Sequence, residues 1–141
     1  MQSLTSKNEL LKQCESDILR FEKEKQSHSK YADYWGKTYL ILGVSGTIFS
    51  ALCAVLTFSE YKIQIALLAA LSAILTGLLA FLNPNQREQD RRKAARDCNN
   101  YVTRVQAFVA EIGCYKTPEE MLKEYKVLTN ERNELVKTSK Y

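Results

Sequence analysis

The stretch that decides the fold is TYLILGVSGTIFSALCAVLTF, residues Thr38–Phe58, which runs for 21 residues without a charged side chain. A second stretch, IQIALLAALSAILTGLLAFL, follows at Ile63–Leu82 and adds 20 more uncharged residues. At about 1.5 Å per residue, each forms a helix of roughly 30 Å, the thickness of a bilayer's hydrocarbon core. The four residues 59–62 between them allow only a tight antiparallel hairpin. We therefore predict two membrane-spanning helices rather than buried helices of a soluble protein.

The charged residues lie almost entirely outside these two stretches. The chain of 141 residues has 20 Lys and Arg and 16 Asp and Glu, of which only Glu60 and Lys62 fall within 38–82. Because positive residues stay in the cytoplasm, the basic flanks predict a multi-pass protein of the cell inner (plasma) membrane with both termini cytoplasmic. The residues that carry this prediction are Lys37, Arg87, Arg91, Arg92, Lys93 and Arg96.

Aromatic residues at the ends of the spans support the same topology, because Trp and Tyr gather at the two membrane surfaces. Those expected at the inner surface are Tyr31, Tyr34, Trp35, Tyr39 and Phe81; those at the outer surface are Phe58 and Tyr61. The net charge of +4 is then explained by basic residues that contact the lipid bilayer and fix the topology. We expect no nucleic-acid partner, since no aromatic residues interleave with the basic run.

The polar arms have helical periodicity, and five Gly and two Pro in the chain leave few turn residues for a sandwich or barrel. We predict an all-α membrane protein in which the hairpin bears a cytoplasmic helical stalk of long antiparallel helices plus a shorter C-terminal helix. Within one domain of residues 1–141, the segments are the N-terminal helix 1–37, spans 38–58 and 63–82 with the external loop 59–62, the second stalk helix 83–113 and the C-terminal helix 117–138. A break at Gly36 is one interpretation of the junction between 1–37 and the first span.

Apolar residues recur every three or four positions along the two long stalk helices. The residues expected to pack there are Leu11, Cys14, Ile18, Phe21, Cys98, Tyr101, Val105, Phe108 and Ile112. Asn83-Pro84 and Thr117-Pro118 have the residues that start helices. Met121, Tyr125, Leu128 and Leu135 share one face of the C-terminal helix, which we expect to cover the groove between the other two.

Small and hydroxyl residues recur along both spans. The first span has Gly43, Gly46, Ser50, Cys53 and Thr57, and the second has Ala69, Ala73 and Thr76, flanked by Ala66 and Ala80. Small residues let helix backbones approach closely, so these residues either pack helices together or line a pore between several copies. One hairpin cannot enclose a pore, so any channel requires a homo-oligomer. The spans have no ionisable group, which argues against a proton relay.

Residues suited to catalysis or to metal binding are missing from the sequence. The four cysteines, at 14, 53, 98 and 114, have no metal-binding spacing, and there is no HExxH, phosphate loop or nucleophile elbow. His28 is the only histidine, and we expect it at the surface or at an interface. We predict a protein that is not an enzyme and needs no cofactor or metal.

Several segments together resemble the SLATT domain, a two-span effector domain. These segments are Ser27-His28-Ser29-Lys30-Tyr31-Ala32-Asp33-Tyr34-Trp35, Leu40-Ile41-Leu42-Gly43-Val44-Ser45-Gly46, Phe81-Leu82-Asn83-Pro84-Asn85-Gln86-Arg87 and Arg91-Arg92-Lys93-Ala94-Ala95-Arg96 leading to Tyr101. The resemblance covers roughly residues 20–112. It implies a pore-forming membrane effector of prokaryotic antiviral defence of the abortive infection type, gated by an operon-encoded sensor or a nucleotide signal. The alternative is a non-conducting two-span scaffold whose coiled stalk docks a partner protein.

Overall fold

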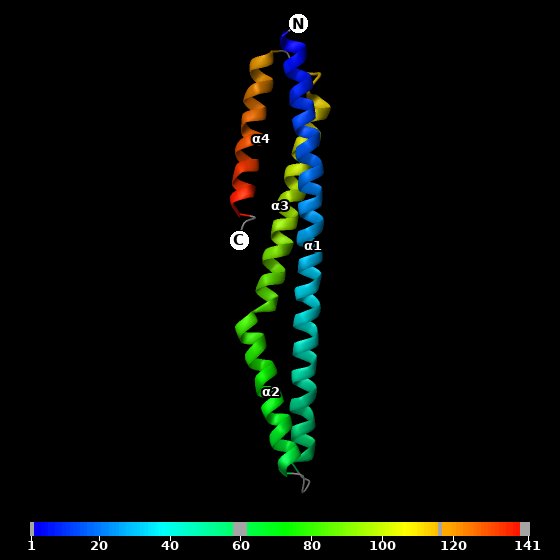
Figure 1. The fold of residues 1–141 in the computed structure, drawn as a ribbon, viewed down its shortest axis with the longest axis vertical. Helices are drawn as coiled ribbons and strands as arrows, with labels where there is room; N and C mark the ends of the chain where they lie inside the picture. Colours follow the sequence, from blue (N-terminus) through cyan, green and yellow to red (C-terminus); the bar gives the residue numbers. More distant parts are fainter. Residues whose placement is uncertain (1, 58–61, 116, 139–141) are drawn as a thin grey trace. The chain divides into compact units, whose positions relative to one another are not determined.

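The computed structural model describes residues 2–57, 62–115 and 117–138. It has four helices: α1 (Gln2–Leu56), α2 (Lys62–Leu82), α3 (Pro84–Glu111) and α4 (Pro118–Thr138) (Figure 1). Among these described residues there is no strand. Two of the helices are long and apolar enough to cross a membrane, which confirms the predicted all-α, two-span class.

The chain divides into two compact units. Residues Met1–Ser29 and Arg92–Tyr141 form one, which we call the stalk unit, and Lys30–Arg91 form the other, which we call the hairpin unit. Helices α1 and α3 each contribute to both units, whereas α2 belongs to the hairpin unit and α4 to the stalk unit.

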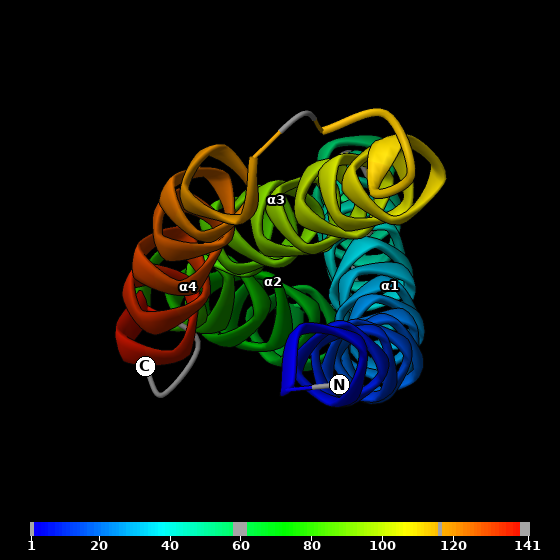
Figure 2. The ribbon, with the colours of Figure 1, turned by 90° about the horizontal axis from the view of Figure 1, so that it is seen from above.

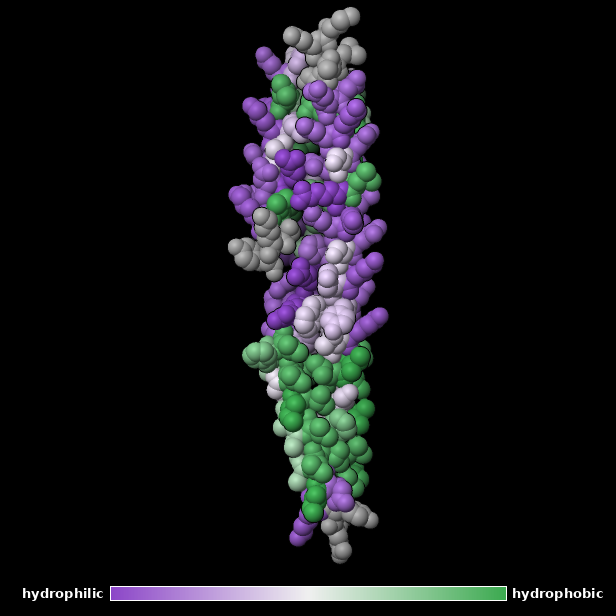
Figure 3. Space-filling model, viewed as in Figure 1, coloured by the Kyte–Doolittle hydropathy of each residue, from purple (hydrophilic) through white to green (hydrophobic). Residues whose placement is uncertain are grey.

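The hairpin unit exposes an apolar surface. Only 6% of the most apolar window of the first span is buried, and none of that of the second. Figure 3 shows hydrophobic side chains covering α2 and the part of α1 beside it. A core helix of a soluble protein would bury such residues, so this surface is suited to lipid. The predicted outer aromatics Phe58 and Tyr61 and the loop 59–61 lie outside the described residues.

Helix α1 runs through Gly36 without a break, so the interpretation of a break there is wrong. A glycine inside a helix costs about 1 kcal/mol relative to alanine, too little to interrupt a helix supported on both sides. Gly36 has a packing role instead: a Cβ atom there would lie 2.9 Å from Oε2 of Glu88 on α3.

Asn83 makes the turn between α2 and α3. Its φ of 42° is left-handed, a conformation that asparagine tolerates better than most residues. Its N–H donates to the Leu79 carbonyl at 3.1 Å, and its carbonyl accepts from the Arg87 N–H at 3.2 Å. Asn83 thus ends α2 and begins α3, and buried Pro84 occupies the first helical position, as the Asn83-Pro84 pattern predicts.

The stalk unit is a three-helix core made by the beginning of α1, the later part of α3 and α4 (Figure 2). The Phe21 and Tyr101 ring centroids, on α1 and α3, lie 4.6 Å apart, and those of Phe108 and Tyr125, on α3 and α4, lie 6.2 Å apart. Tyr125 also donates a hydrogen bond to Gln13 of α1 at 2.7 Å. Helix α4 therefore contacts both long helices, as its apolar face predicts.

Most residues predicted for stalk packing belong to this core. Cys14, Phe21, Cys98, Tyr101, Val105 and Phe108 are buried, and Ile18 and Ile112 pack against them. The prediction that Leu11 packs in this core is wrong. Leu11 is half-buried and is not in the cluster, whereas its neighbour Leu10 is buried in it. The positions of Leu10, Cys14 and Phe21 belong to a seven-residue repeat, in which position 17 is seven residues after Leu10 and Phe21 is seven after Cys14. Position 17 holds the polar Asp17, so the repeat is not visible as a pattern of apolar residues.

Candidate functional site

Three side chains hold the two spans together within the hairpin unit. The hydroxyl oxygens of Ser50 and Ser72 lie 2.7 Å apart, and the Ser72 hydroxyl lies 3.4 Å from the carbonyl oxygen of Gly46. Each hydroxyl has one proton, so the consistent arrangement has Ser50 donating to Ser72 and Ser72 donating to Gly46. One turn further along, the Cys53 thiol donates to the Ile65 carbonyl at 3.7 Å.

The predicted residues of the first span divide into two groups. Gly46, Ser50 and Cys53 meet α2, and a Cβ on Gly46 would lie 3.8 Å from the Leu75 Cβ. Gly43 has nothing within 4 Å of the place of its Cβ, and the Thr57 hydroxyl donates to the Cys53 carbonyl of its own helix. Three of the five residues of this stripe therefore close the hairpin, and the other two face outward from a single chain.

The predicted residues of the second span lie on its exposed surface. Ala69, Ala73 and Thr76 are exposed, and the Thr76 hydroxyl donates to the Ser72 carbonyl of its own helix. The half-buried residues of α2 are instead Ile65, Leu68, Ser72, Leu75 and Leu79. Ser72 was not predicted as a contact between the spans. It is the only hydroxyl residue among these five positions, which recur every three or four residues and otherwise hold Ile or Leu. That Ala69, Ala73 and Thr76 pack or line a pore between chains stays a prediction.

We expect Ser72→Ala to weaken the pairing of the two spans by about 1 kcal/mol, because hydroxyl bonds between spans contribute on that order. Thr76→Ala is the matched control, since its hydroxyl bonds within α2. Single-molecule forced unfolding of the full chain in bicelles would measure both variants. Equal losses in the two would show that the Ser50–Ser72 contact does not hold the hairpin.

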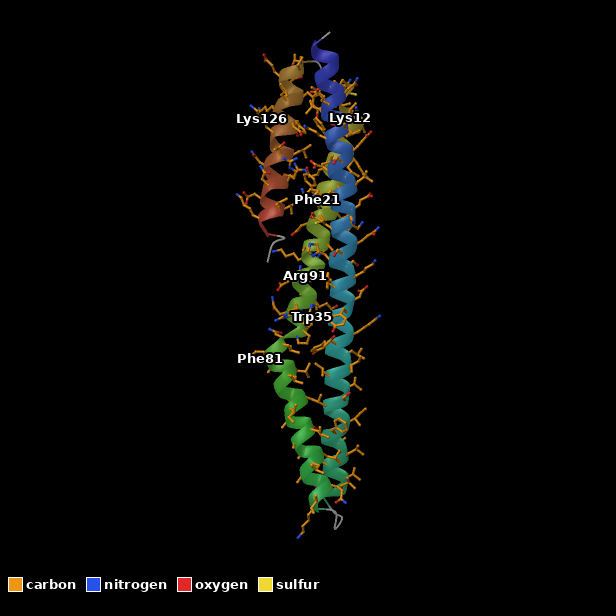
Figure 4. All side chains as sticks on the ribbon, viewed as in Figure 1. Lys12, Phe21, Trp35, Phe81, Arg91 and Lys126 are labelled. Atoms are coloured by element: carbon orange, nitrogen blue, oxygen red, sulfur yellow. The ribbon has the colours of Figure 1, made fainter. Side chains whose placement is uncertain are left out.

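Arginines of α3 stack on aromatic residues of α1 at the polar end of the hairpin unit. The Arg87 guanidinium carbon lies 4.8 Å from the centroid of the Trp35 ring, and that of Arg91 lies 5.9 Å from the Tyr31 ring (Figure 4). Lys37 is exposed on α1. The remaining predicted basic residues, Arg92, Lys93 and Arg96, belong to the stalk unit and are also exposed.

A polar group joins the three helices of the stalk unit. One carboxylate oxygen of Asp17 accepts from the Tyr101 hydroxyl at 3.3 Å and from the Arg132 guanidinium at 3.2 Å. Burial, followed by the negative charge of Asp17, raises the pKa of Tyr101 above its ordinary value. Tyr101 therefore stays a hydrogen-bond donor at neutral pH. No sequence pattern predicts the pairing of Asp17 with Arg132, because they are 115 positions apart and neither is apolar.

Two further polar side chains of the stalk unit are more enclosed than the sequence indicates. His28 is only 8% exposed, so of the two places expected for it, the surface and an interface, the surface is wrong. Glu24 bonds Arg20 through one oxygen at 3.0 Å. Its negative charge adds to burial in raising the pKa of the Cys98 thiol to about 11. Cys14 and Cys98 are both buried and free, consistent with their role as small core residues.

A cavity of about 410 Å³ lies between α3 and α4 of the stalk unit. It is lined by Asp97, Asn100, Tyr101, Arg104, Asn130, Glu131, Glu134 and Leu135, and Arg104 pairs with Glu131 across it. Over the part of the chain described, no group of three or more His, Cys, Asp and Glu side chains is placed to hold a metal ion.

The chain matches a family model over most of its length. The fungal SLATT model, described as the SMODS and SLOG-associating 2TM effector domain, matches residues 19–138. No curated protein and no solved structure matches the chain. The matched range includes both spans, the turn at Asn83 and all of α3 and α4, so it confirms the resemblance to the SLATT domain.

Proposed function

Because the chain belongs to the SLATT family of two-span membrane effector domains, we propose that several copies of it assemble into a pore. The observation that carries this proposal is the surface of α2. Its small residues are exposed in a single chain, and a hairpin closed by Ser50 and Ser72 leaves that exposed surface available to another copy. Since two helices cannot surround a channel, a conducting form needs this second contact.

Two glycines support assembly through close helix contacts. Apart from chain neighbours and the nearby backbone of its own helix, neither Gly43 on α1 nor Gly77 on α2 has an atom within 4 Å of the place of its Cβ. Ala69 and Ala73 add further small, exposed positions on α2. Small residues at such positions allow the backbones of neighbouring spans to approach, which is how membrane helices commonly associate. Ser50 is exposed as well, and its hydroxyl is suited to a polar lumen lining.

The proposal also covers the membrane in which the pore forms, the signal that opens it and its role in the cell. The effector would sit in the inner (plasma) membrane with both termini in the cytoplasm, and open on a signal from a separate sensor protein or a nucleotide. Its opening would arrest or kill an infected cell in an antiviral response. The prokaryotic host is part of this proposal, and the fungal name of the matched model makes a fungal host the alternative. Genomic context would decide between the two.

Purified protein reconstituted into dye-loaded liposomes should release the dye in a concentration-dependent manner. Ala73→Leu should lower the release rate by about ten-fold, because losing a close contact between spans costs on the order of 1–2 kcal/mol. Leu71→Phe, on the other flank of α2, is the matched control and should leave release unchanged. Tight liposomes at every protein concentration and with every trigger, together with no toxicity on overexpression, would overturn the pore.

A non-conducting scaffold is the second candidate function. The cavity of about 410 Å³ between α3 and α4 favours it, since its lining of both charge signs suits a side chain of a docked partner. A scaffold needs the same hairpin and the same stalk unit but no lumen. Assembly of the chain in bilayers without any conductance, and capture of a partner that Asn130→Trp abolishes, would favour the scaffold over the pore.

A further inference from the structure

Two neighbouring cavities of the stalk unit form one groove along α3 and α4. One has a volume of about 410 Å³ and the other of about 150 Å³, and Arg104 lines both. Their lining residues lie on α3, on α4 or in the segment that connects these helices. We call the two cavities together the α3–α4 groove. A groove between two helices holds the side chains of a third helix that packs along it.

The α3–α4 groove combines apolar surface with negative charge. Tyr101, Phe108 and Leu135 line it, so it is suited to an apolar side chain. Among the described residues that line it, carboxylates outnumber basic groups by five to one. The surface that fits such a groove therefore combines an apolar side chain with positive charges. The carboxylates are those of Asp97, Glu111, Glu124, Glu131 and Glu134, and the basic group is the Arg104 guanidinium.

The side of α1 that faces away from the core of the stalk unit has this combination. Lys12, Ser16, Leu19 and Lys23 are exposed and recur at steps of four, three and four residues, so they lie on one face of the helix. Leu19 is 69% exposed and lies about 160° around the helix from the buried Phe21, at roughly 100° per residue. We call these four residues the α1 stripe. It presents one leucine between two lysines.

Contacts within one copy place Leu19 at the level of the larger cavity. Helix α3 runs antiparallel to α1 (Figure 1). Asp17 and Phe21, two residues before and two residues after Leu19, both contact Tyr101, which lines that cavity. In a ring whose axis runs along the stalk helices, copies are related by rotation and are not shifted along the axis. Leu19 of one copy therefore lies level with the larger cavity of the next.

The same reasoning places Lys12 level with a carboxylate. Gln13, the neighbour of Lys12, accepts a hydrogen bond from Tyr125, the neighbour of Glu124, at 2.7 Å. Glu124 lines the smaller cavity. In the ring, Lys12 of one copy is therefore level with Glu124 of the next, and the two have opposite charges.

We propose that the α3–α4 groove is the docking site for the α1 stripe of a second copy of this chain, with Leu19 in the larger cavity and Lys12 beside Glu124. This inference rests on the proposed assembly of several copies and adds the surface by which their stalk units meet. Because groove and stripe are different surfaces of one copy, copies add head to tail until a ring closes. The contact lies between copies, so it adds nothing to the free energy of unfolding of a single copy in a micelle.

Cysteine cross-linking of the full chain in liposomes tests this contact. Ser16→Cys puts a thiol in the stripe and Asn100→Cys puts one in the groove lining, and Cys114→Ser removes the exposed natural thiol. A short bismaleimide should link the copies of this variant into dimers, trimers and longer products on a denaturing gel. Each single variant should stay monomeric. Asn99→Cys is the matched control for Asn100→Cys, because Asn99 is also exposed but accepts a hydrogen bond from Lys25 of α1; with Ser16→Cys it should give monomer.

Charge reversal at Lys12 gives a second measurement in the Ser16→Cys/Asn100→Cys variant. Lys12→Glu places a like charge beside Glu124 of the next copy and should lower the linked fraction about five-fold. Adding Glu124→Lys restores opposite charges and should return the linked fraction to within about two-fold of its starting value. If this second change brings no recovery, the pairing of Lys12 with Glu124 is overturned.

Dye release from the same liposomes separates this inference from the proposed pore. Linked products in liposomes that stay tight with every trigger would support the stalk contact and overturn the pore. Dye release without linked products would support the pore and overturn the stalk contact, leaving the groove to a different partner. Dimers from Ser16→Cys alone would show that copies meet α1 to α1, which would overturn the head-to-tail contact.

Discussion

Replacing Phe21 with alanine should destabilise the stalk unit by about 3–5 kcal/mol, the usual cost of deleting a fully buried aromatic ring. Phe21 is 0% exposed, and its ring packs against that of Tyr101 of α3, with the centroids 4.6 Å apart and the planes tilted by 56°. The lost ring would leave a cavity beside the Asp17–Tyr101 hydrogen bond and weaken the polar group that also binds Arg132 of α4. Hydrogen exchange of the full chain in detergent micelles would measure the loss as faster exchange of amides 98–111 on α3.

Leu19→Ala is the matched control for this variant. Leu19 lies two residues away on α1 but is 69% exposed, so its truncation should change the free energy of unfolding by less than about 0.5 kcal/mol. If Leu19→Ala speeds exchange on α3 as much as Phe21→Ala does, the buried ring is not what holds α1 to α3. Unchanged exchange in Phe21→Ala would contradict the packing of the core.

The sequence predicts the elements of this protein well, because their signals are local. An uncharged run of about twenty residues has few alternatives to a span. Asn83-Pro84 and Thr117-Pro118 place helix starts where they occur: the Thr117 hydroxyl accepts from the Glu120 N–H at 3.3 Å. Helix ends at Leu56 and Glu111, two residues before those predicted, are within the fraying that any helix terminus shows.

The faces of the two spans could not be predicted, since both helices are apolar all round. In a membrane no hydrophobic force selects one face of such a helix, and hydrogen bonds and packing decide instead. The small residues Ala69 and Ala73 suggested that their side of α2 contacts the first span. The hydrogen bond between Ser50 and Ser72 instead places a different side of α2 against that span. That contact joins residues 22 positions apart and depends on the length of the loop between them.

The polar contacts of the stalk unit were hidden for a different reason. Asp17 lies within the seven-residue repeat of α1, where a search for periodic apolar residues expects none. Its partners, Tyr101 and Arg132, come from two other helices, so no local pattern connects the three. The family resemblance supplies the effector role, which no periodicity contains.

Alkaline pH should unfold the stalk unit through its buried thiol and phenol. Cys98 is 3% exposed, and burial with the charges of Glu24 and Asp97 raises its pKa from 9.0 to about 11. Burial also raises the pKa of Tyr101. Both groups bind their protons more tightly in the folded state than in the unfolded state, so their protonation stabilises the fold. This contribution to the free energy of unfolding is complete below pH 9. It is lost as the pH rises, first for Cys98 between pH 9 and 11. A rise in the pKa of Cys98 from 9.0 to about 11 corresponds to at most about 3 kcal/mol.

Variants separate this titration from the general loss of lysine charge at high pH. Cys98→Ala should lower stability at pH 7, because it leaves a small cavity, and should make the decline between pH 9 and 11 shallower by up to about 3 kcal/mol. Cys114→Ala, at an exposed position, should keep the slope of the natural chain. Thermal unfolding of the full chain in micelles, followed by circular dichroism at pH 8, 9, 10 and 11, gives these slopes. Parallel slopes for Cys98→Ala and the natural chain would mean that the thiolate forms without opening the core, and that water reaches Cys98 in the folded stalk unit.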